Sequence, residues 1–462
     1  MGFFFPLTIA REALLAHQRA LQVTGHNIAN VNTPGFSRQR AELAAIVIGD
    51  GFGAGVRVTA VQQAIDPFLQ ARRLASASTL AAATTGRDLL DRVQALFPVQ
   101  GPGIGDALQQ FFAAANGLAT HPQELASRSD VLGCAESLVG QLRDAAAALA
   151  TMQREADGQI AQAARDANGA LATIAQLNHS IVAAEIGGGT ANDLRDARRA
   201  ALDQIAQALQ VHVIEQEDGS VSVFAASGTT LVMGSDAATL ATEGDPTAVG
   251  LDGDPLSRVG LRSASGSVIA LSGELGGTIG ALVAQRDQTL PASAANLDLF
   301  ATTLRDAVNA VQTDPAGRDL DGLVGFELFT GSGAADLTVA LTDPRSIAAA
   351  RSANPGDNAG ARALVAVGDA TFAALGGATL GDFFGTVQAG AGEQARRADE
   401  RATVEENLAS ALAAQRDAIS GVNLEEEFTD LIRFQRGFQA AAQLITVSNR
   451  MLDDLFGLLV NV

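Results

Sequence analysis

The stretch GHNIANVNTPGFSRQ (residues 25–39) ends an apolar helical repeat near the start of the chain, and SGVNLEEE (residues 420–427) opens a longer one near its end. The later repeat continues almost to Val462. Neither helix can bury its apolar stripe alone, because an isolated amphipathic helix is marginal in water. We therefore expect the two ends of the chain to cover each other and then to pack against further copies.

The apolar residues at both ends follow the 4-3 spacing of a coiled-coil seam. The C-terminal seam consists of Leu424, Phe428, Leu431, Gln435, Phe438, Ala442, Ile445, Asn449, Leu452, Phe456 and Leu459. The N-terminal seam consists of Leu7, Ala10, Leu14, His17, Leu21, Thr24, Ile28 and Val31. A plain intramolecular helical hairpin would show the same spacing and stays an alternative.

Turn residues predict where the N-terminal helix ends. Pro34 pushes Thr33 out of the helical region, and Pro34-Gly35 suits the two central positions of a type II turn. The amides of Asn30 and Asn32 can hydrogen-bond the carbonyls that are freed at the helix end. A simple helix stop, with no role in assembly, would use the same residues.

Capping residues predict where the C-terminal helix begins. Asn423 is a good N-cap, and Glu426 three residues later completes a box-like cap. From the seams, the turn and this cap we predict an assembly interface. Its members are Leu14, Leu21, Ile28, Asn30, Asn32, Thr33, Pro34, Gly35, Asn423, Leu424, Phe428, Leu431, Gln435, Phe438, Ile445 and Leu452.

Both end motifs resemble those of a known family. NVNTPGF (residues 30–36) is similar to the N-terminal motif shared by bacterial flagellar rod, hook and hook-associated axial proteins. VNLEEE (residues 422–427), followed by QRGFQA (residues 435–440), resembles their C-terminal motif. Phe36 and Phe438 stand where members of this family often carry Tyr.

Interior motifs narrow the resemblance to the hook-associated members that stand at the hook–filament junction. These motifs are SRQ at residues 37–39, NDLRD at 192–196, GELGG at 273–277 with Arg286-Asp287, and NPGDN at 354–358. The resemblance implies a structural protein that forms a ring of identical subunits between the hook protein and the next hook-associated protein. It also implies an export chaperone, export without a cleaved signal peptide, and a place outside the cell. A hook or rod subunit, or a wall hydrolase carried on flagellar-type termini, are the alternatives.

Composition and residue types argue against other classes of function. The formal net charge of −20 disfavours nucleic-acid and anionic-membrane binding, which need basic surfaces. All 31 basic residues are arginine, so neither a P-loop lysine nor a Schiff-base lysine exists. The histidines are scattered without metal-ligand spacing. We expect no metal, no cofactor and no enzymatic activity.

The pattern along the chain predicts a mainly α fold with β-rich insertions. Discontinuous N- and C-terminal coiled-coil helices would join a central helical-bundle domain that carries β-hairpins. We predict an assembly domain from residues 1–75 and 400–462, with a hairpin at about 38–64. The central domain would comprise residues 76–208 and 274–399, and residues 209–273 would be β-rich.

Local signals place the individual elements. Asp66-Pro67 starts a helix that runs to about Leu96, and Asn192 is expected to cap another. Cys134, the one cysteine, lies in an apolar helical stretch and is predicted to be buried and inert. The remaining predictions are helices at about 104–118, 129–186 and 277–312, a hairpin at 211–224, strands near 258–262 and 267–272, and a glycine-rich mixed region at 317–392.

Overall fold

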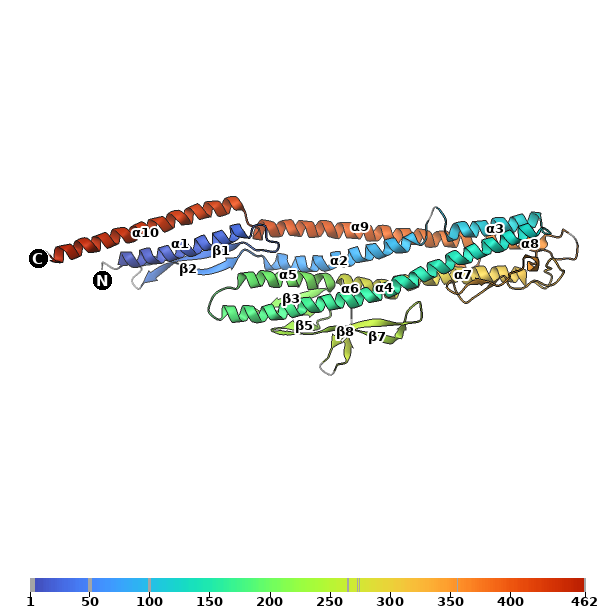
Figure 1. Cartoon of the computed structure of the whole chain (residues 1–462), viewed down its shortest axis with the longest axis horizontal. Helices are drawn as coiled ribbons and strands as arrows, with labels where there is room; N and C mark the ends of the chain where they lie inside the picture. Colours follow the sequence, from blue (N-terminus) through green and yellow to red (C-terminus); the bar gives the residue numbers. More distant parts are fainter. Residues whose placement is uncertain are drawn as a thin grey trace.

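The protein is elongated, and both terminal helices lie at the same end of the molecule (Figure 1). This structure, a computed structural model, describes residues 5–48, 52–98, 101–263, 266–271, 273, 275–354 and 356–460; at residues 48, 52 and 455–460 it describes the backbone alone. Helices dominate the chain and strands appear in small separate sheets, so the predicted fold class is confirmed.

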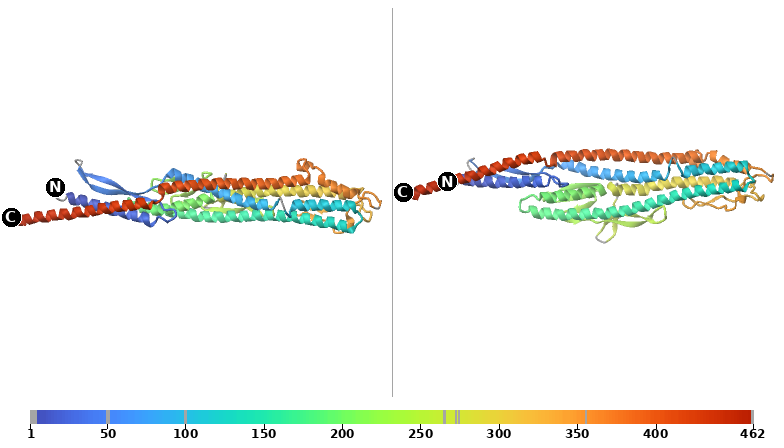
Figure 2. Two further views of the ribbon diagram at one scale, coloured as in Figure 1. Left: turned by 90° about the horizontal axis from the view of Figure 1, so that it is seen from above. Right: turned by 45° about the horizontal axis from the view of Figure 1, so that its top comes forward.

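The terminal layer is an antiparallel pair of helices, α1 (Phe5–Ala29) and α10 (Leu424–Val460). Asn27 contacts Glu427, whereas His17 lies against Gly437, so the two helices run in opposite directions. The hairpin of β1 (Gln39–Ile48) and β2 (Phe52–Gln63) lies alongside α1, as predicted for residues 38–64. The C-terminal part of α10 extends past the start of α1 (Figures 1 and 2).

A long helical arm leads away from this pair (Figure 2). It comprises α2 (Pro67–Ala95), α3 (Ile104–Thr120), α4 (Leu125–Glu185), α5 (Asn192–Ala208), α6 (Gly277–Ala284), α7 (Leu290–Gln312), α8 (Ala359–Asp369) and α9 (Leu380–Ser420). Asp66 caps α2 by accepting hydrogen bonds from the backbone of Phe68 and Leu69. The arm's core is built on α4, whose Leu138, Leu142 and Ile160 are fully buried.

The β-rich segment forms two sheets beside α4. The first contains β3 (Val211–Glu215), β4 (Val221–Ala225), β5 (Thr230–Met233) and β6 (Asp236–Ala237), and the second β7 (Leu240–Val249), β8 (Pro255–Arg262) and β9 (Val268–Ala270). The predicted hairpin is therefore confirmed, and Gly219 in its turn has a φ of +83°. A small pair, β10 (Phe329–Thr330) and β11 (Thr338–Val339), lies near the far end.

Some local predictions were wrong. Asn192 is the first residue of α5 rather than its cap, because its side chain donates a hydrogen bond to the Val61 carbonyl of β2. A π-helical turn at Gln285–Thr289 interrupts the predicted helix at 277–312. Helix α9 begins at Leu380, inside the region read as mixed, and Cys134 is half-buried rather than buried. Residues Ser272, Glu274 and Pro355 of the quoted motifs and strands lie outside the described residues.

The division into domains stays a prediction, although α2 and α9 run through residues 75 and 400 without a break. Among the described residues, no helix is both long enough and apolar enough to cross a bilayer.

Candidate functional site

The two end motifs meet in a buried joint around Arg38, which lies where α1, β1 and α10 come together. The Arg38 Nε donates to the Glu427 carboxylate at 2.6 Å, and its Nη1 donates to Glu426 at 2.5 Å. Arg38 is 7% exposed and Glu427 is 2% exposed, so this ion pair is largely shielded from water. The N-terminal and C-terminal motifs, some 390 residues apart in sequence, therefore form one site.

Asn27 completes this joint from the last turn of α1. Its Oδ1 accepts from the Gln39 backbone N–H at 2.9 Å, and its Nδ2 donates to the Gln39 carbonyl at 2.8 Å and to Glu427 at 3.0 Å. A buried amide whose donor and acceptor are both used fixes one arrangement of its neighbours. Asn27 therefore fixes the angle between α1, β1 and α10, although sequence analysis did not single it out.

The electrostatics of the joint favour the charged guanidinium. Burial alone would lower the pKa of Arg38, but hydrogen bonds and charge from Glu426 and Glu427 outweigh burial and raise it. A buried ion pair is not by itself a source of stability, but the loss of one partner leaves an uncompensated buried charge. The joint therefore depends on Arg38 and Glu427 being present together.

The arm is attached to the same joint. The Arg38 backbone N–H donates to the Ser420 carbonyl at the end of α9, at 2.8 Å. The Ser37 backbone N–H donates to Asp196, and the Gln39 side chain donates to Asp193, both in α5. The SRQ and NDLRD motifs, which sequence analysis found separately, are thus in direct contact.

The predicted type II turn is present beside the joint. The Phe36 backbone N–H donates to the Thr33 carbonyl at 3.2 Å, and Gly35 has a φ of +83°. Asn30 bonds the freed His26 carbonyl at 3.0 Å, as predicted. The Asn32 side chain, in contrast, is exposed and makes no hydrogen bond to any part of the chain that the structure describes.

Gly35→Val should separate assembly from folding. A β-carbon at positive φ costs about 1–2 kcal/mol, and nothing lies within 4 Å of the position where it would be placed, so backbone strain is the whole effect. We expect impaired junction formation in cells with little change in the thermal unfolding of the arm. The prediction fails if this variant supports filaments like the native chain, or if the arm itself unfolds.

The start of α10 agrees with prediction only in part. The Glu425 backbone N–H donates to the Asn423 side chain at 3.0 Å, so Asn423 is the N-cap. Glu426 does not complete the predicted box, because its carboxylate binds Arg38 instead. Arg38, which is distant in sequence, binds the Glu426 carboxylate in place of the backbone N–H of Asn423.

The predicted C-terminal seam is half right. The line that faces α1 is Glu427, Phe434, Ala441 and Ser448, which are buried and spaced by seven residues. The predicted residues beside this line are half-buried: Leu431, Phe438, Ile445 and Leu452. The other predicted line is turned outward at Phe428, Gln435 and Asn449, which are exposed, and is half-buried at Ala442. Leu424, at the start of the first line, is exposed as well. The side chains of Phe456 and Leu459 lie outside the described residues.

The predicted N-terminal seam is partly buried. Ala10 and Thr24 are buried, and half-buried positions include Leu14, His17, Leu21 and Ile28. Pro34 at the end of this segment is exposed, like Asn32 and Gly35. The role of these residues in contacts between subunits remains a proposal.

His17 fits against α10 where Gly437 leaves room for its ring. A β-carbon at residue 437 would lie 2.6 Å from the imidazole, and the Phe434 ring is 6.2 Å away between centroids. The His17 Nδ1 is buried and has no hydrogen-bond partner among the described residues. Burial, together with the nearby charge of Arg433, lowers the pKa of His17 from its usual 6.5.

Acidification should therefore loosen the α1–α10 pair. Because the packed pair favours neutral imidazole, the contribution of His17 is complete above about pH 6.5 and is lost as the pH falls through the lowered pKa. The protection factors of α10 amides against hydrogen exchange, compared at pH 7.5 and 5.0, measure this loss. His17→Gln should flatten the pH dependence, whereas His121→Gln, on the exposed end of the arm, should leave it unchanged.

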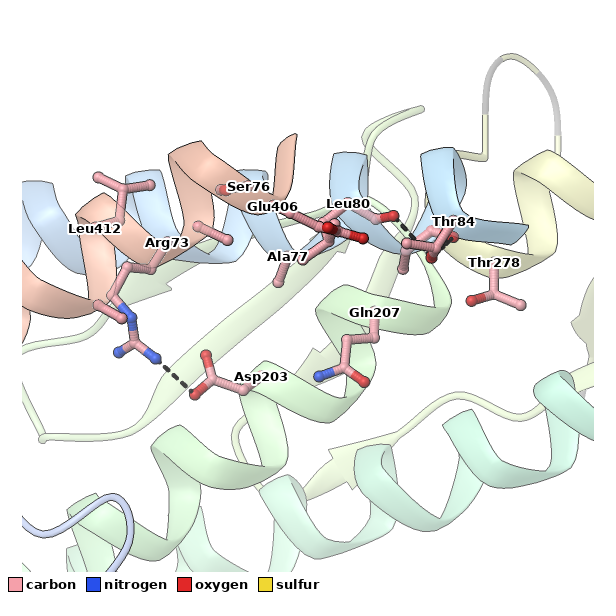
Figure 3. Close-up of a pocket in the computed structure, with 13 residues that line it drawn as sticks. Arg73, Ser76, Ala77, Leu80, Thr84, Asp203, Gln207, Thr278, Glu406 and Leu412 are labelled. Carbon is pink, nitrogen blue, oxygen red and sulfur yellow. Dashed lines mark hydrogen bonds and ion pairs between the residues drawn. The ribbon is translucent and has the colours of Figure 1, made fainter. Parts of the chain in front are cut away.

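The arm also contains a cavity of about 570 Å³ between α2, α5, α6 and α9 (Figure 3). Arg73 pairs with Asp203 at 3.3 Å across its floor, and burial raises the pKa of Asp203 despite that partner. Neither histidine nor cysteine lines it, and no cluster of metal-ligating side chains occurs in the described part of the chain.

Comparison with known proteins shows the family to which the chain belongs. The family model described as the flagellar hook-associated protein FlgK helical domain matches residues 90–329, more than half of the sequence. The chain belongs to the FlgK family. Models of the flagella basal body rod protein and of the flagellar basal body rod FlgEFG protein C-terminal region match residues 7–36 and 413–458. These ranges include most of α1 and α10, with Asn27 and Glu427 of the joint, and the first ends two residues before Arg38.

Relatives in the FlgK family cover nearly the whole chain. Flagellar hook-associated protein 1 of Salmonella typhimurium is 24% identical over 550 residues, spanning 97% of this chain and 99% of the relative. The Bacillus subtilis protein of the same name is 25% identical over 494 residues, spanning 97% of each. A solved structure, the flagellar hook junction protein FlgK from Burkholderia pseudomallei, shares the fold with a TM-score of 0.68 at 15% identity. It covers 76% of this chain and 100% of that one. The family is one of structural flagellar proteins, as expected from the end motifs.

Proposed function

We propose that this chain forms the junction between the flagellar hook and filament by self-assembly through α1 and α10. The observation that carries the proposal is the joint, in which Arg38, Asn27 and Glu427 bring both end motifs of the chain into one buried network. Such a network holds the terminal helix pair at one angle to the arm. A ring of identical subunits needs that angle to be the same in every copy.

The second support is the exposed apolar surface of α10, which lies in two clusters on either side of the buried line that faces α1. Leu424, Phe428, Ile432, Leu444, Val447 and Met451 are large apolar side chains that are exposed on this helix. Clusters of exposed large apolar side chains mark a place where another surface docks. We propose that other copies cover this surface, so that the predicted interface residues that face outward, Phe428 among them, contact neighbours.

Partners and location follow from the same proposal. The terminal ring would contact the hook protein on one side and the next hook-associated protein on the other. An export chaperone would hold the chain before assembly, and the chain would act outside the cell after export. The acidic surface implied by a net charge of −20 does not suit nucleic-acid or anionic-membrane partners. We propose no enzymatic role.

A deletion strain tests the proposal directly. Cells that lack the chain should assemble hooks without filaments in electron micrographs, and a plasmid copy should restore filaments. Loss of the hook itself would indicate a rod or hook subunit instead, and normal filaments would exclude the junction role. A peptidoglycan hydrolysis assay on the purified chain separates a structural protein from a wall hydrolase.

A further inference from the structure

Helix α9 leaves an apolar face uncovered on the arm, just before the joint. Val404, Leu408 and Ile419 are 64%, 41% and 43% exposed. At 3.6 residues per turn these three side chains project within an arc of about 60°. Two buried residues of this segment, Ala402 and Ser420, project at least about 100° away from Val404 and Ile419, and the third, Leu412, lies at the edge of the face, about 20° beyond Ile419.

The spacing on this face suits a helix as its partner. Val404, Leu408, Ala411, Gln415 and Ala418 repeat with the 4-3 spacing of a coiled-coil seam. The smaller members of the seam allow the backbone of a second helix to approach closely, and the larger ones supply apolar area. An exposed seam of this kind on a single chain lacks the helix that would complete it.

The inner side of the same segment packs on α2, where Thr79 donates a hydrogen bond to Glu405, but it has few fully buried positions. Between residues 401 and 420, the buried positions are Ala402, Leu412 and Ser420. The cavity of about 570 Å³ separates α9 at Glu406–Ala413 from α5 (Figure 3). Since a helix gains most of its stability from packing, this half of α9 has much to gain from a partner on its outer face.

The position of the face indicates which partner covers it. Helices α9 and α10 lie end to end along the molecule, separated by residues 421–423 (Figures 1 and 2). Exposed apolar residues continue across the joint at Leu424, Phe428 and Ile432. Copies arranged to cover α10 are thus already next to this part of α9.

We propose that the face of α9 formed by Val404, Leu408 and Ile419 is a second contact between subunits, occupied by helix α10 of a neighbouring copy. Helix α10 is chosen because its exposed apolar residues next to the joint, Leu424, Phe428 and Ile432, project within an arc of about 80°. The contact is heterologous, so it can close into a ring. The inference rests on the proposed self-assembly and extends the interface from the terminal pair onto the arm.

A photo-reactive amino acid at position 404 of the full chain tests this contact in assembled junctions isolated with their hooks. The expected product is a covalent dimer of two copies with the adduct mapped to α10. An intramolecular adduct on α10 near Phe428 is excluded by distance, because residues 404–420 of α9 alone span roughly 24 Å and α10 continues away from them. The same probe at Ser410, exposed on another side of α9, is the matched control and should give no dimer.

Charged substitutions give an independent readout. Val404→Asp with Leu408→Asp should reduce the number of filament-bearing cells at least tenfold, with the thermal unfolding of the arm unchanged, whereas Ser410→Asp should do nothing. The inference is overturned if the double variant assembles normally, or if the probe at 404 labels a different protein or nothing while a probe at Phe428 gives dimers. If Phe428→Asp also assembles normally, the proposed self-assembly fails instead.

Discussion

Arg38→Met is expected to abolish junction assembly and to release α1 and α10 from each other. The substitution keeps an unbranched side chain but leaves Glu427, which is 2% exposed, without a counter-charge. Breaking a buried pair in this way costs about 3–5 kcal/mol. Hydrogen exchange should show faster exchange of amides near the start of α10, and cells should lack filaments.

The chain offers a matched control and a rescue for this variant. Arg40→Met makes the same change two residues away, at an exposed position outside the joint, and should have almost no effect. Adding Glu427→Gln to Arg38→Met removes the orphaned charge and should recover part of the lost protection. If Arg38→Met alone assembles like the native chain, the joint does not control the terminal pair.

Phe434→Asp and Phe428→Asp should both prevent filament assembly, but for different reasons. Phe434 is buried against α1, so a carboxylate there should cost at least about 3 kcal/mol and open the helix pair within one copy. Phe428 is 52% exposed, so the same change should leave the isolated chain intact but prevent copies from associating. Both variants should lack filaments.

Hydrogen exchange on the dilute, unassembled chain distinguishes the two. Only Phe434→Asp should accelerate exchange along α10, whereas Phe428→Asp should match the native pattern. Identical exchange in both variants would mean that the two faces of α10 do not have separate roles. Arg165→Gln, on the exposed side of α4, should behave like the native chain in either assay.

Local chemistry explains which elements could be predicted from sequence. Asp66-Pro67 starts a helix, Thr33-Pro34-Gly35 makes a turn and Gly219 closes a hairpin, because each signal acts within a few residues. Strand β7 was missed, since Gly244, Asp245 and Pro246 inside it are typical of loops. Pairing with β8 overrides that preference.

The joint could not be predicted from spacing, because its partners are far apart in the chain. Glu427 reads as a solvated charge at a helix start, and Phe428 beside it reads as a seam residue. Arg38 and Asn27 bury Glu427 instead, which rotates α10 by one residue and turns Phe428 outward. The resemblance to axial proteins located both end motifs but could not show that they bind each other.

Mechanically, the arm can transmit a force at its far end to the joint as a bending moment. A sideways force on the far end, near α8, acts over the length of the arm and is resisted at a few hydrogen bonds around Arg38 and Ser420. These bonds share the residues Arg38 and Glu427, so a rotation that breaks one weakens the rest. Under torque the joint should therefore hold its angle and then yield abruptly, rather than bend in proportion to the load.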